Sequence, residues 1–456
     1  MPAINVHKRI RDTGVQMKAI AFLLFVLPGL ASCVIVSDIF EGNEWCSESI
    51  HTIAPGESTP ELAALCWRAD TVCTFRNAIH SVNLCDVPQT LQLEKGGVYT
   101  FIHADSSWDR RGTPERRVVE VIEKDLTIVG NGATLRIGPS IANLWYFEVA
   151  PGASLNISNL TISGSLRRGC DGEGGASAIY NRGTTVIDHV EFINHYTCTF
   201  AAAVYSTWNL TVRSSAFRNN HSGRTGTGFA AMAAGRPESF DPAIQLNVSD
   251  TLFENNRSDG ARQGAGIIGC FGIPCRLSRL SIIDNQSQRS IVYLGTGEGD
   301  SIGRLDINSS TIVNNSGAHS GAFEQFDGQI WVTDTTIANN TGSVASAYAN
   351  DCCGSITFIN SAVSIPSSVA ACVSPSFSVG PSSHGMANDG SCAGLRTVPD
   401  LQLDPVTRIT PGGLAIVVPK STSPLIDAGS DCLTRDQRGN PRPQGLACDI
   451  GAIEVR

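Results

Sequence analysis

A ten-residue pattern recurs along most of this sequence and limits what the chain can fold into. INSSTIVNN begins at Ile307, and VTDTTIANN begins 25 residues later at Val332. The shared frame is apolar-x-apolar-x-polar-x-x-apolar followed by Asn or a similar residue, and it occurs eight times at steps of 25 to 36 residues. Its first position holds Leu155, Thr185, Leu210, Leu246, Cys275, Leu305, Ile330 and Ile356. Its third holds Ile157, Ile187, Val212, Val248, Leu277, Ile307, Val332 and Phe358, and its eighth holds Ile162, Phe192, Phe217, Phe253, Ile282, Ile312, Ile337 and Val363.

Each copy of the frame predicts strands. Its apolar positions alternate with period two, and β-branched and aromatic residues fill them. A second short strand is expected before the frame, in SAIYN at Ser177, AAVYS at Ala202, SIVYL at Ser290 and GAFEQ at Gly321. A unit this small cannot bury its own apolar face, so it must stack on its neighbours. The sequence therefore predicts an all-β solenoid, a right-handed parallel β-helix of roughly ten coils about 4.8 Å apart.

Positions ten and eleven of the frame are mostly Asn. Asn tolerates left-handed backbone geometry, and identical Asn side chains can bond to one another along a stack of coils. We expect these residues to turn the same corner in every coil and to form a ladder. They are Asn194/His195, Asn219/Asn220, Asn255/Asn256, Asp284/Asn285, Asn314/Asn315 and Asn339/Asn340.

The composition fits one long domain. Only 16% of the 456 residues are charged, 45 are Gly, and the net charge is -9, so no basic stripe points to nucleic acid. Solenoids grow by adding coils, so a single solenoid domain can be longer than an ordinary globular domain. We divide the chain into a leader (1–33), an N-terminal cap region (34–88), the β-helix (89–370), and the last coils with a C-terminal cap (371–456).

The first residues resemble a lipoprotein signal. A basic stretch, HKRIRD, precedes the apolar run AIAFLLFVLPGL, which is too short for a permanent membrane span. The following Leu30-Ala31-Ser32-Cys33 resembles the bacterial lipobox, in which the Cys becomes lipidated. The resemblance implies a lipid anchor on Cys33 at the outer membrane or cell surface, with Met1 or Met17 as the start. An ordinary signal peptide followed by a chance Cys is the alternative.

The cysteines agree with export. Of the 15 Cys, removing Cys33 leaves an even number for disulfides in an oxidising compartment. We expect Cys270 to pair with Cys275, Cys432 with Cys448, and Cys170 with Cys198. Zinc is the weaker reading, because the chain has no C-x-x-C pair and its nine His are scattered.

Both open ends of a solenoid need caps, because they expose core and strand edges. At the N-terminal end, ELAALCWRA and CTFRNAIHSVN between Cys46 and Cys85 predict helices. Phe75, Ala78, Ile79 and Val82 give the second of them one apolar stripe.

Three family resemblances follow from these motifs. GNGATLRI, NLTISG and AIYNRGTTV resemble right-handed parallel β-helix repeat proteins of bacterial surfaces, including the polymorphic outer-membrane protein type. VCTFRNAIHSVN resembles the CSLREA domain, with matches at Cys73, Arg76 and Ala78 and departures at Thr74, Phe75 and Asn77. The tail resembles the choice-of-anchor Q domain at Asp427, Ala428, Gly429, Asp436, Gln437, Arg438, Gly439, Arg442, Pro443, Cys448, Asp449, Gly451 and Glu454.

The tail also raises a metal question. Proteins of the choice-of-anchor Q type tend to carry a sorting signal after this domain, whereas in this chain the lipid on Cys33 is the expected anchor. Its Asp, Arg and Cys residues predict a salt-bridged, disulfide-closed cap, and a calcium site at Asp427 and Asp431 is the alternative.

The parallel β-helix also carries polysaccharide lyases, glycosidases and epimerases, so the fold alone does not give the function. Lys is absent from the repeats, and the chain has no HExxH, P-loop or G-x-S-x-G motif. An acidic edge precedes the frames at Asp241, Glu298, Asp300, Glu324, Asp327 and Asp351. Stacking brings such carboxylates together, where a pair could act as general acid and base on a glycoside or bind a cation, and Asp300 and Glu324 are the candidates. The alternative is a solvated turn edge.

We expect a monomeric, lipid-anchored surface protein with a structural, adhesive or glycan-binding role and no cofactor. Its ligand would be a polysaccharide or another cell-surface molecule. A polysaccharide-processing enzyme, a lyase or glycoside hydrolase, is the alternative function.

Overall fold

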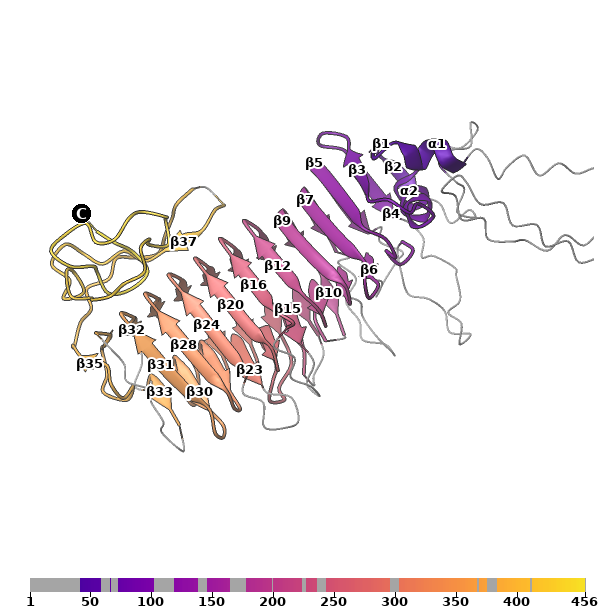
Figure 1. Ribbon diagram of the computed structural model, residues 1–456. Coiled ribbons are helices and arrows are strands. Elements are labelled where there is room, and N and C mark those ends of the chain that lie inside the picture. The colour runs from indigo at the N-terminus through magenta and orange to yellow at the C-terminus, as the bar shows by residue number, and fades with distance from the viewer. Residues whose placement is uncertain are drawn as a thin grey trace, which may run out of the picture. The chain divides into compact units, whose positions relative to one another are not determined.

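The protein is an all-β stack of parallel coils, as predicted (Figure 1). The computed structural model describes residues 42–58, 66, 73–101, 119–137, 146–164, 178–198, 200–223, 227–235, 243–295, 303–366, 369–374, 384–410 and 412–455. All of them belong to one compact unit, Gly42–Arg456. In these ranges, the helices are too short or too polar to cross a membrane.

Each complete coil contains four short strands from three sheets. One coil runs through β23 (Val292–Gly295), β24 (Arg304–Asn308), β25 (Thr311–Val313) and β26 (Ser316–Gly317). Each strand pairs in parallel with its equivalent in the next coil, so the chain winds as a right-handed parallel β-helix. Figure 1 shows the equivalent strands side by side in chain order, from indigo to orange.

The largest sheet covers two sides of the coil and contains 21 strands in the described ranges. At its N-terminal end lie β1 (Ile50–Ile53), β2 (Gly56–Ser58), β3 (Gln89–Leu93), β4 (Val98–Phe101), β5 (Leu126–Ile137), β7 (Ser154–Ser163) and β9 (Thr184–Ile193). The repeats add β12 (Leu210–Arg213), β13 (Ala216–Arg218), β16 (Leu246–Ser249), β17 (Leu252–Glu254), β20 (Pro274–Ser278), β21 (Ser281–Ile283), β24, β25, β28 (Gln329–Thr333), β29 (Thr336–Ala338), β31 (Ser355–Ile359) and β32 (Ala362–Ser364). It ends with β34 (Met386–Ala387) and β35 (Arg396–Thr397).

Two smaller sheets close the coil. The nine-stranded sheet comprises β6 (Phe147–Val149), β8 (Ile179–Asn181), β11 (Val204–Ser206), β15 (Phe229–Gly235), β19 (Gly266–Phe271), β23, β27 (Phe323–Gln325), β30 (Tyr348–Asn350) and β33 (Cys372–Val373). The five-stranded sheet comprises β10 (Tyr196–Thr197), β14 (His221–Ser222), β18 (Arg257–Ser258), β22 (Gln286–Ser287) and β26.

The strand register is the one that the repeat frame predicts. In the first position, Leu305 pairs with Ile330; in the third, Ile307 pairs with Val332. The eighth position behaves in the same way in every coil that has the frame. These side chains point inward and are almost fully buried. Phe192, Phe217 and Phe253 stack in one such row, with ring centroids 4.8 and 4.9 Å apart.

The turns between strands show that positions ten and eleven of the frame have different roles, although the sequence predicted one shared role for them. Position ten takes the left-handed conformation, with φ between 51° and 58° at Asn194, Asn219, Asn255, Asp284, Asn314 and Asn339. Position five is also left-handed, with φ between 44° and 54° at Asn159, His189, Ser214, Asp250, Arg279, Ser309, Asp334 and Asn360. Because Ser and Arg rarely adopt this conformation, the stacking of the coils imposes this second corner.

Position eleven forms the ladder. The Asn285 amide donates to Oδ1 of Asn315 at 2.9 Å and to the Phe253 carbonyl at 3.0 Å. Its own Oδ1 accepts from the backbone and side-chain nitrogens of Asn256 at 2.9 and 3.0 Å. Asn220, Asn256, Asn315 and Asn340 repeat the pattern, and all are buried. At the ladder's N-terminal end, the His195 backbone nitrogen donates to Asn220 Oδ1.

Two helices lie at the N-terminal end of the stack (Figure 1): α1 (Gly42–Ser47) and α2 (Phe75–Asn83). Thr74 caps α2, since its hydroxyl accepts from the Asn77 nitrogen at 3.3 Å. The predicted apolar stripe of α2 is fully buried. Phe75 makes edge contacts with Tyr99, Phe101 and Phe147 of the first coils. Most of the helix predicted in ELAALCWRA falls outside the described residues.

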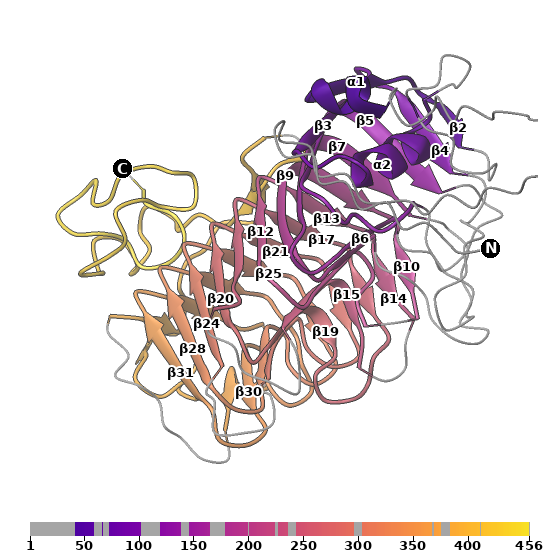
Figure 2. The same ribbon diagram turned by 45° about the vertical axis from the view of Figure 1, so that its right-hand side comes forward.

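The C-terminal segment does more than close the last coil. From Leu401 it runs beside earlier coils, carrying the antiparallel pair β36 (Thr407–Arg408) and β37 (Ala415–Ile416) (Figures 1 and 2). Gln437 accepts from the Thr311 hydroxyl at 2.6 Å and donates to the Leu280 carbonyl at 2.8 Å. The apolar residues of the C-terminal segment cover an outer strip of Leu252, Ile283, Val313 and Ala338.

Disulfides occur along the whole described chain. The pairs are Cys46–Cys85, Cys66–Cys73, Cys270–Cys275, Cys352–Cys353, Cys372–Cys392 and Cys432–Cys448. Cys198 is also disulfide-bonded, whereas Cys170 lies outside the described residues, so that pairing stays a prediction. The bond between the adjacent residues Cys352 and Cys353 follows β30 directly.

Candidate functional site

The outer face of the nine-stranded sheet carries an unusual row of side chains. In its short strands the first and third residues point into the core, and the middle residue points outward. Parallel register aligns these middle residues into one row that crosses eight strands. We call it the outer row: Glu148, Tyr180, Tyr205, Ala233, Gly269, Tyr293, Glu324 and Ala349.

An aromatic cluster covers the middle of the outer row. Its members are Phe200, Tyr205, Phe229, Phe271 and Tyr293, and it is separate from the core inside the coils. Neighbouring rings lie 5.0 to 5.5 Å apart between centroids. The small outer-row residues make room for it, because a Cβ on Gly269 would lie 2.3 Å from the Phe229 ring.

At the N-terminal end of the outer row, Tyr180 and Tyr205 stack in parallel with centroids 5.4 Å apart. Arg182 lies over the Tyr180 ring, 5.6 Å from its centroid, and pairs with Glu148. These half-buried side chains present aromatic edges and charge together.

Glu324 lies at the other end, beyond Tyr293. Its side chain is completely buried, although it stands on the outer side of β27. Arg289 Nε donates to Glu324 Oε1 at 2.7 Å. Among the residues that the structure describes, Oε2 has no hydrogen-bond partner. Burial raises the pKa of Glu324 to about 7; Arg289 opposes the shift, and Asp351 adds to it.

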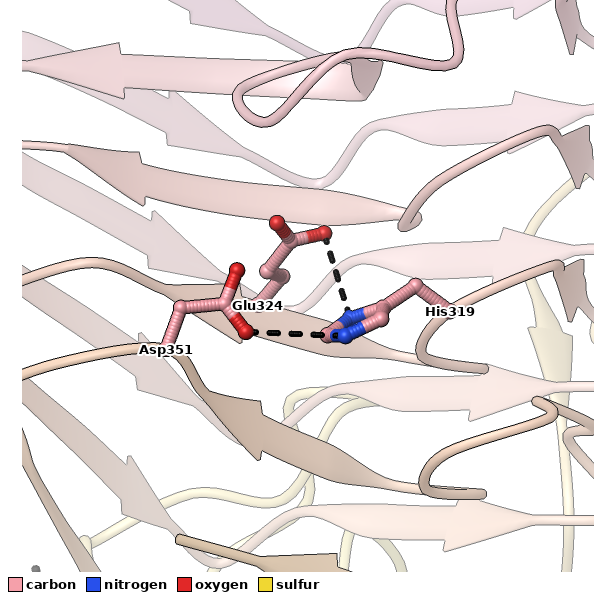
Figure 3. A group of neighbouring side chains, drawn as sticks. All are labelled: His319, Glu324 and Asp351. Carbon is pink, nitrogen blue, oxygen red and sulfur yellow. Dashed lines mark ion pairs between the residues drawn. The ribbon is translucent and has the colours of Figure 1, made fainter. Parts of the chain in front are cut away.

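His319 and Asp351 complete this group, as Figure 3 shows. His319 Nδ1 lies 3.7 Å from Glu324 Oε2, and His319 Nε2 lies 3.5 Å from Asp351 Oδ1. Asp351 Oδ2 accepts from Arg289 and from Gln263. Burial, and then the nearby Arg289, lower the pKa of His319. The group therefore joins two carboxylates, an imidazole and a guanidinium at one end of the outer row.

The predicted acidic edge is represented here by two residues. Glu324 and Asp351 converge, whereas the Asp327 carboxylate accepts from the Gly328 nitrogen at 2.6 Å and shapes a turn. Asp241, Glu298 and Asp300, as well as Cys33, fall outside the described residues. The complete burial of Glu324 differs from a solvated turn edge, because the aromatic cluster and Arg289 shield it.

Sequence reasoning missed His319, Arg289 and the outer row. A signal was present, since Tyr180, Tyr205, Tyr293 and Glu324 occupy the same fourth place in SAIYN, AAVYS, SIVYL and GAFEQ. Aligning those pieces by strand register reveals the row. His319 and Arg289 come from turns of variable length, so no position in the repeat marks them.

Metal binding can be assessed from the donor groups. In the described part of the chain, one group of three His, Cys, Asp or Glu side chains has the spacing for an ion: His319, Glu324 and Asp351. The group does not include Asp427 or Asp431. The Asp427 carboxylate instead accepts from the Ala447 nitrogen at 3.0 Å, inside the tail.

A second concave surface lies between the large sheet and the C-terminal segment. This cleft of about 650 Å³ is lined by both strands and tail, including Glu191, Arg218 and Thr410. Arg218 already pairs with Glu191 and Glu254 and donates to the Gly412 carbonyl. Because its central charges are satisfied within the protein, the cleft is a weaker candidate than the outer row.

Comparisons with known proteins give a fold likeness only. No protein-family profile and no curated protein matches the chain. One solved structure, described as the crystal structure of pectate lyase Pel9A, aligns with a TM-score of 0.49 and 14% identity, covering 90% of this chain and 97% of that one. The resemblances to the CSLREA and choice-of-anchor Q domains stay predictions.

Proposed function

We propose that this protein is exported and binds an extended glycan along the outer face of its nine-stranded sheet. The observation that carries the proposal is the outer row itself. Five of its eight residues are aromatic or ionisable, on the side of a sheet where ordinary solvated residues suffice. Polysaccharide recognition uses this combination of apolar surface and placed polar groups.

The length of the outer row favours a polymer over a small molecule. Eight strands at about 4.8 Å span about 34 Å from first to last. The surface changes character along that distance, from Glu148 and Arg182 through the aromatic cluster to the ionic group around Glu324. An elongated ligand would contact the half-buried side chains along this line, Tyr180, Arg182, Tyr205 and Arg289.

Two features support export and anchoring as part of this proposal. Disulfides from Cys46 to Cys448 suit an oxidising compartment. The lipobox-like sequence before Cys33 would hold the mature protein at a membrane surface by its lipid. Replacing Cys33 by Ser should release the protein from the membrane fraction, and absence of lipid in the wild type would refute the anchor.

Glycan cleavage is the second candidate function. The observation in its favour is that two carboxylates and an imidazole meet beside the aromatic cluster, as acid-base chemistry on a glycoside requires. Incubation with pectic, alginate and glycosaminoglycan polymers should be followed for new reducing ends or unsaturated products. Turnover that Glu324→Gln abolishes would establish the enzyme; binding without turnover would leave the binding role.

The binding proposal is tested on the aromatic part of the row. Tyr205→Ala should weaken binding of whichever of these polymers the protein retains by at least tenfold, because it removes a ring from the stack with Tyr180. Trp331→Ala is the matched control, since Trp331 is also a half-buried aromatic side chain at the middle of a strand but lies on the large sheet, in β28. Equal losses in both variants, or no loss in either, would place the ligand elsewhere.

A further inference from the structure

The group of His319, Glu324 and Asp351 has the composition and spacing of a metal site. His319 lies in a turn, Glu324 on β27, and Asp351 just after β30 in the next coil. One ligand atom from each residue lies within 4.8 Å of the other two. We propose that these three side chains bind a divalent transition-metal ion of the Zn²⁺ type.

The distances fit ligands of a common ion better than they fit hydrogen bonds. The contacts of His319 are too long for hydrogen bonds, and they start from different ring nitrogens: Nδ1 lies 3.7 Å from Glu324 Oε2 and Nε2 lies 3.5 Å from Asp351 Oδ1. Two ligand atoms that each lie about 2.1 Å from a tetrahedral Zn²⁺ are about 3.4 Å apart. Because one nitrogen of His319 binds one ion, the imidazole would turn so that a single nitrogen faces both carboxylates, and one ligand atom from each residue already lies within 4.8 Å of the other two.

The atoms that face this position lack other partners. In the described ranges, neither Glu324 Oε2 nor His319 Nδ1 has a hydrogen bond, and both atoms are buried. Leaving a buried carboxylate oxygen unpaired costs about 1 to 3 kcal/mol or more, so such atoms are rare without a function. Figure 3 shows Glu324 and Asp351 both directed towards the His319 ring.

Arg289 holds the ligands from behind. It donates to Glu324 Oε1 and Asp351 Oδ2, the oxygens turned away from His319. Gln263 Nε2 adds a bond to Asp351 Oδ2 at 3.2 Å. Hydrogen-bonded carboxylates of this kind are typical around metal ligands. When both carboxylates are ionised, they exceed the single guanidinium by one negative charge, which would attract a cation.

The donor set selects the class of ion. Imidazole nitrogen is a good ligand for Zn²⁺, whereas Ca²⁺ takes six to eight oxygens and little nitrogen. With three protein ligands, a tetrahedral ion would have a fourth position for a water molecule or a ligand atom. On the proposed glycan-binding function, an oxygen of the ligand would occupy it; metal binding itself does not depend on that function.

Zinc uptake tests the proposal directly. Untagged, disulfide-bonded protein freed of metal by chelation is titrated with ZnCl₂ and CaCl₂ by calorimetry, without any glycan. We expect one equivalent of Zn²⁺ bound at least tenfold more tightly than Ca²⁺. Co²⁺ in its place should give the visible absorption of a four-coordinate ion.

The variants locate the ion. His319→Ala and Glu324→Gln should each remove that equivalent or weaken it at least tenfold. The control is His221→Ala, because His221 Nε2 contacts Asp259 at 2.7 Å in a pair that has one carboxylate. Circular dichroism checks folding, and Asp351→Asn replaces any variant that fails to fold. Absence of stoichiometric zinc in the wild type, or uptake that these variants leave unchanged, would overturn the proposal. Glycan binding could still fail or succeed separately.

Discussion

The Asn ladder and the outer row are both stacks of equivalent residues, yet they are built in opposite ways. The ladder repeats one residue type, and its side chains form hydrogen bonds from one coil to the next. The outer row changes residue at almost every step and ends at Glu324, whose Oε2 lacks a partner among the described residues. Uniform rows stabilise a solenoid. A varied row that contains a buried, incompletely paired carboxylate lowers the stability of the fold, and such places are typical of functional sites.

The largest expected effect comes from breaking the uniform row. Asn285→Ala removes four buried hydrogen bonds and leaves the Asn256 backbone N–H without its acceptor. We expect the free energy of unfolding to fall by about 4 kcal/mol, measured by urea denaturation. Gln286→Ala, at the exposed neighbouring position, is the control and should change it by less than about 0.5 kcal/mol.

His195 tests the ladder through pH. Burial lowers the pKa of His195 to about 4, and its Nε2 bonds to the Ile162 carbonyl at 3.0 Å. Below pH 6.5 the imidazole of His195 binds a proton in the unfolded chain, whereas in the folded protein it stays neutral down to about pH 4. Stability should therefore fall by about 3 kcal/mol as pH drops from 6.5 to 4.

His195→Asn sharpens this test, because Asn is the residue that the next coils use at the same position. The variant should keep the ladder bonds and lose that part of the pH dependence. An unchanged pH profile in urea denaturation would show that other groups cause it.

The smallest effect is expected in the outer row. Gly269→Ala would push a methyl group into the buried Phe229 ring, so we expect a loss of about 2 kcal/mol together with weaker glycan binding. Gly56→Ala, where a Cβ meets nothing within 4 Å, is the control. A neutral Gly269→Ala would mean that the aromatic cluster is loosely packed, and the contrast between the two rows would weaken.

The repeat predicted the fold down to strand register, since inward positions such as Ile307 and Val332 are read directly from period two. It did not predict the left-handed corner at Arg279 or His189, because neighbouring coils impose that backbone. For the site, Glu324 and Asp351 were candidates by residue type. Arg289 lies 62 residues before Asp351 and donates to it because of the path of its own turn. The repeat pattern does not encode that path.

The C-terminal segment has a consequence for how the chain is made. Arg408 pairs with Glu254, 154 residues earlier, and the tail covers the apolar strip at Leu252, Ile283, Val313 and Ala338. Because a chain is synthesised from its N-terminus, the coils along that strip are made before the segment that covers them. Without the segment from residue 401 onward, this strip would be an exposed apolar surface, which favours aggregation.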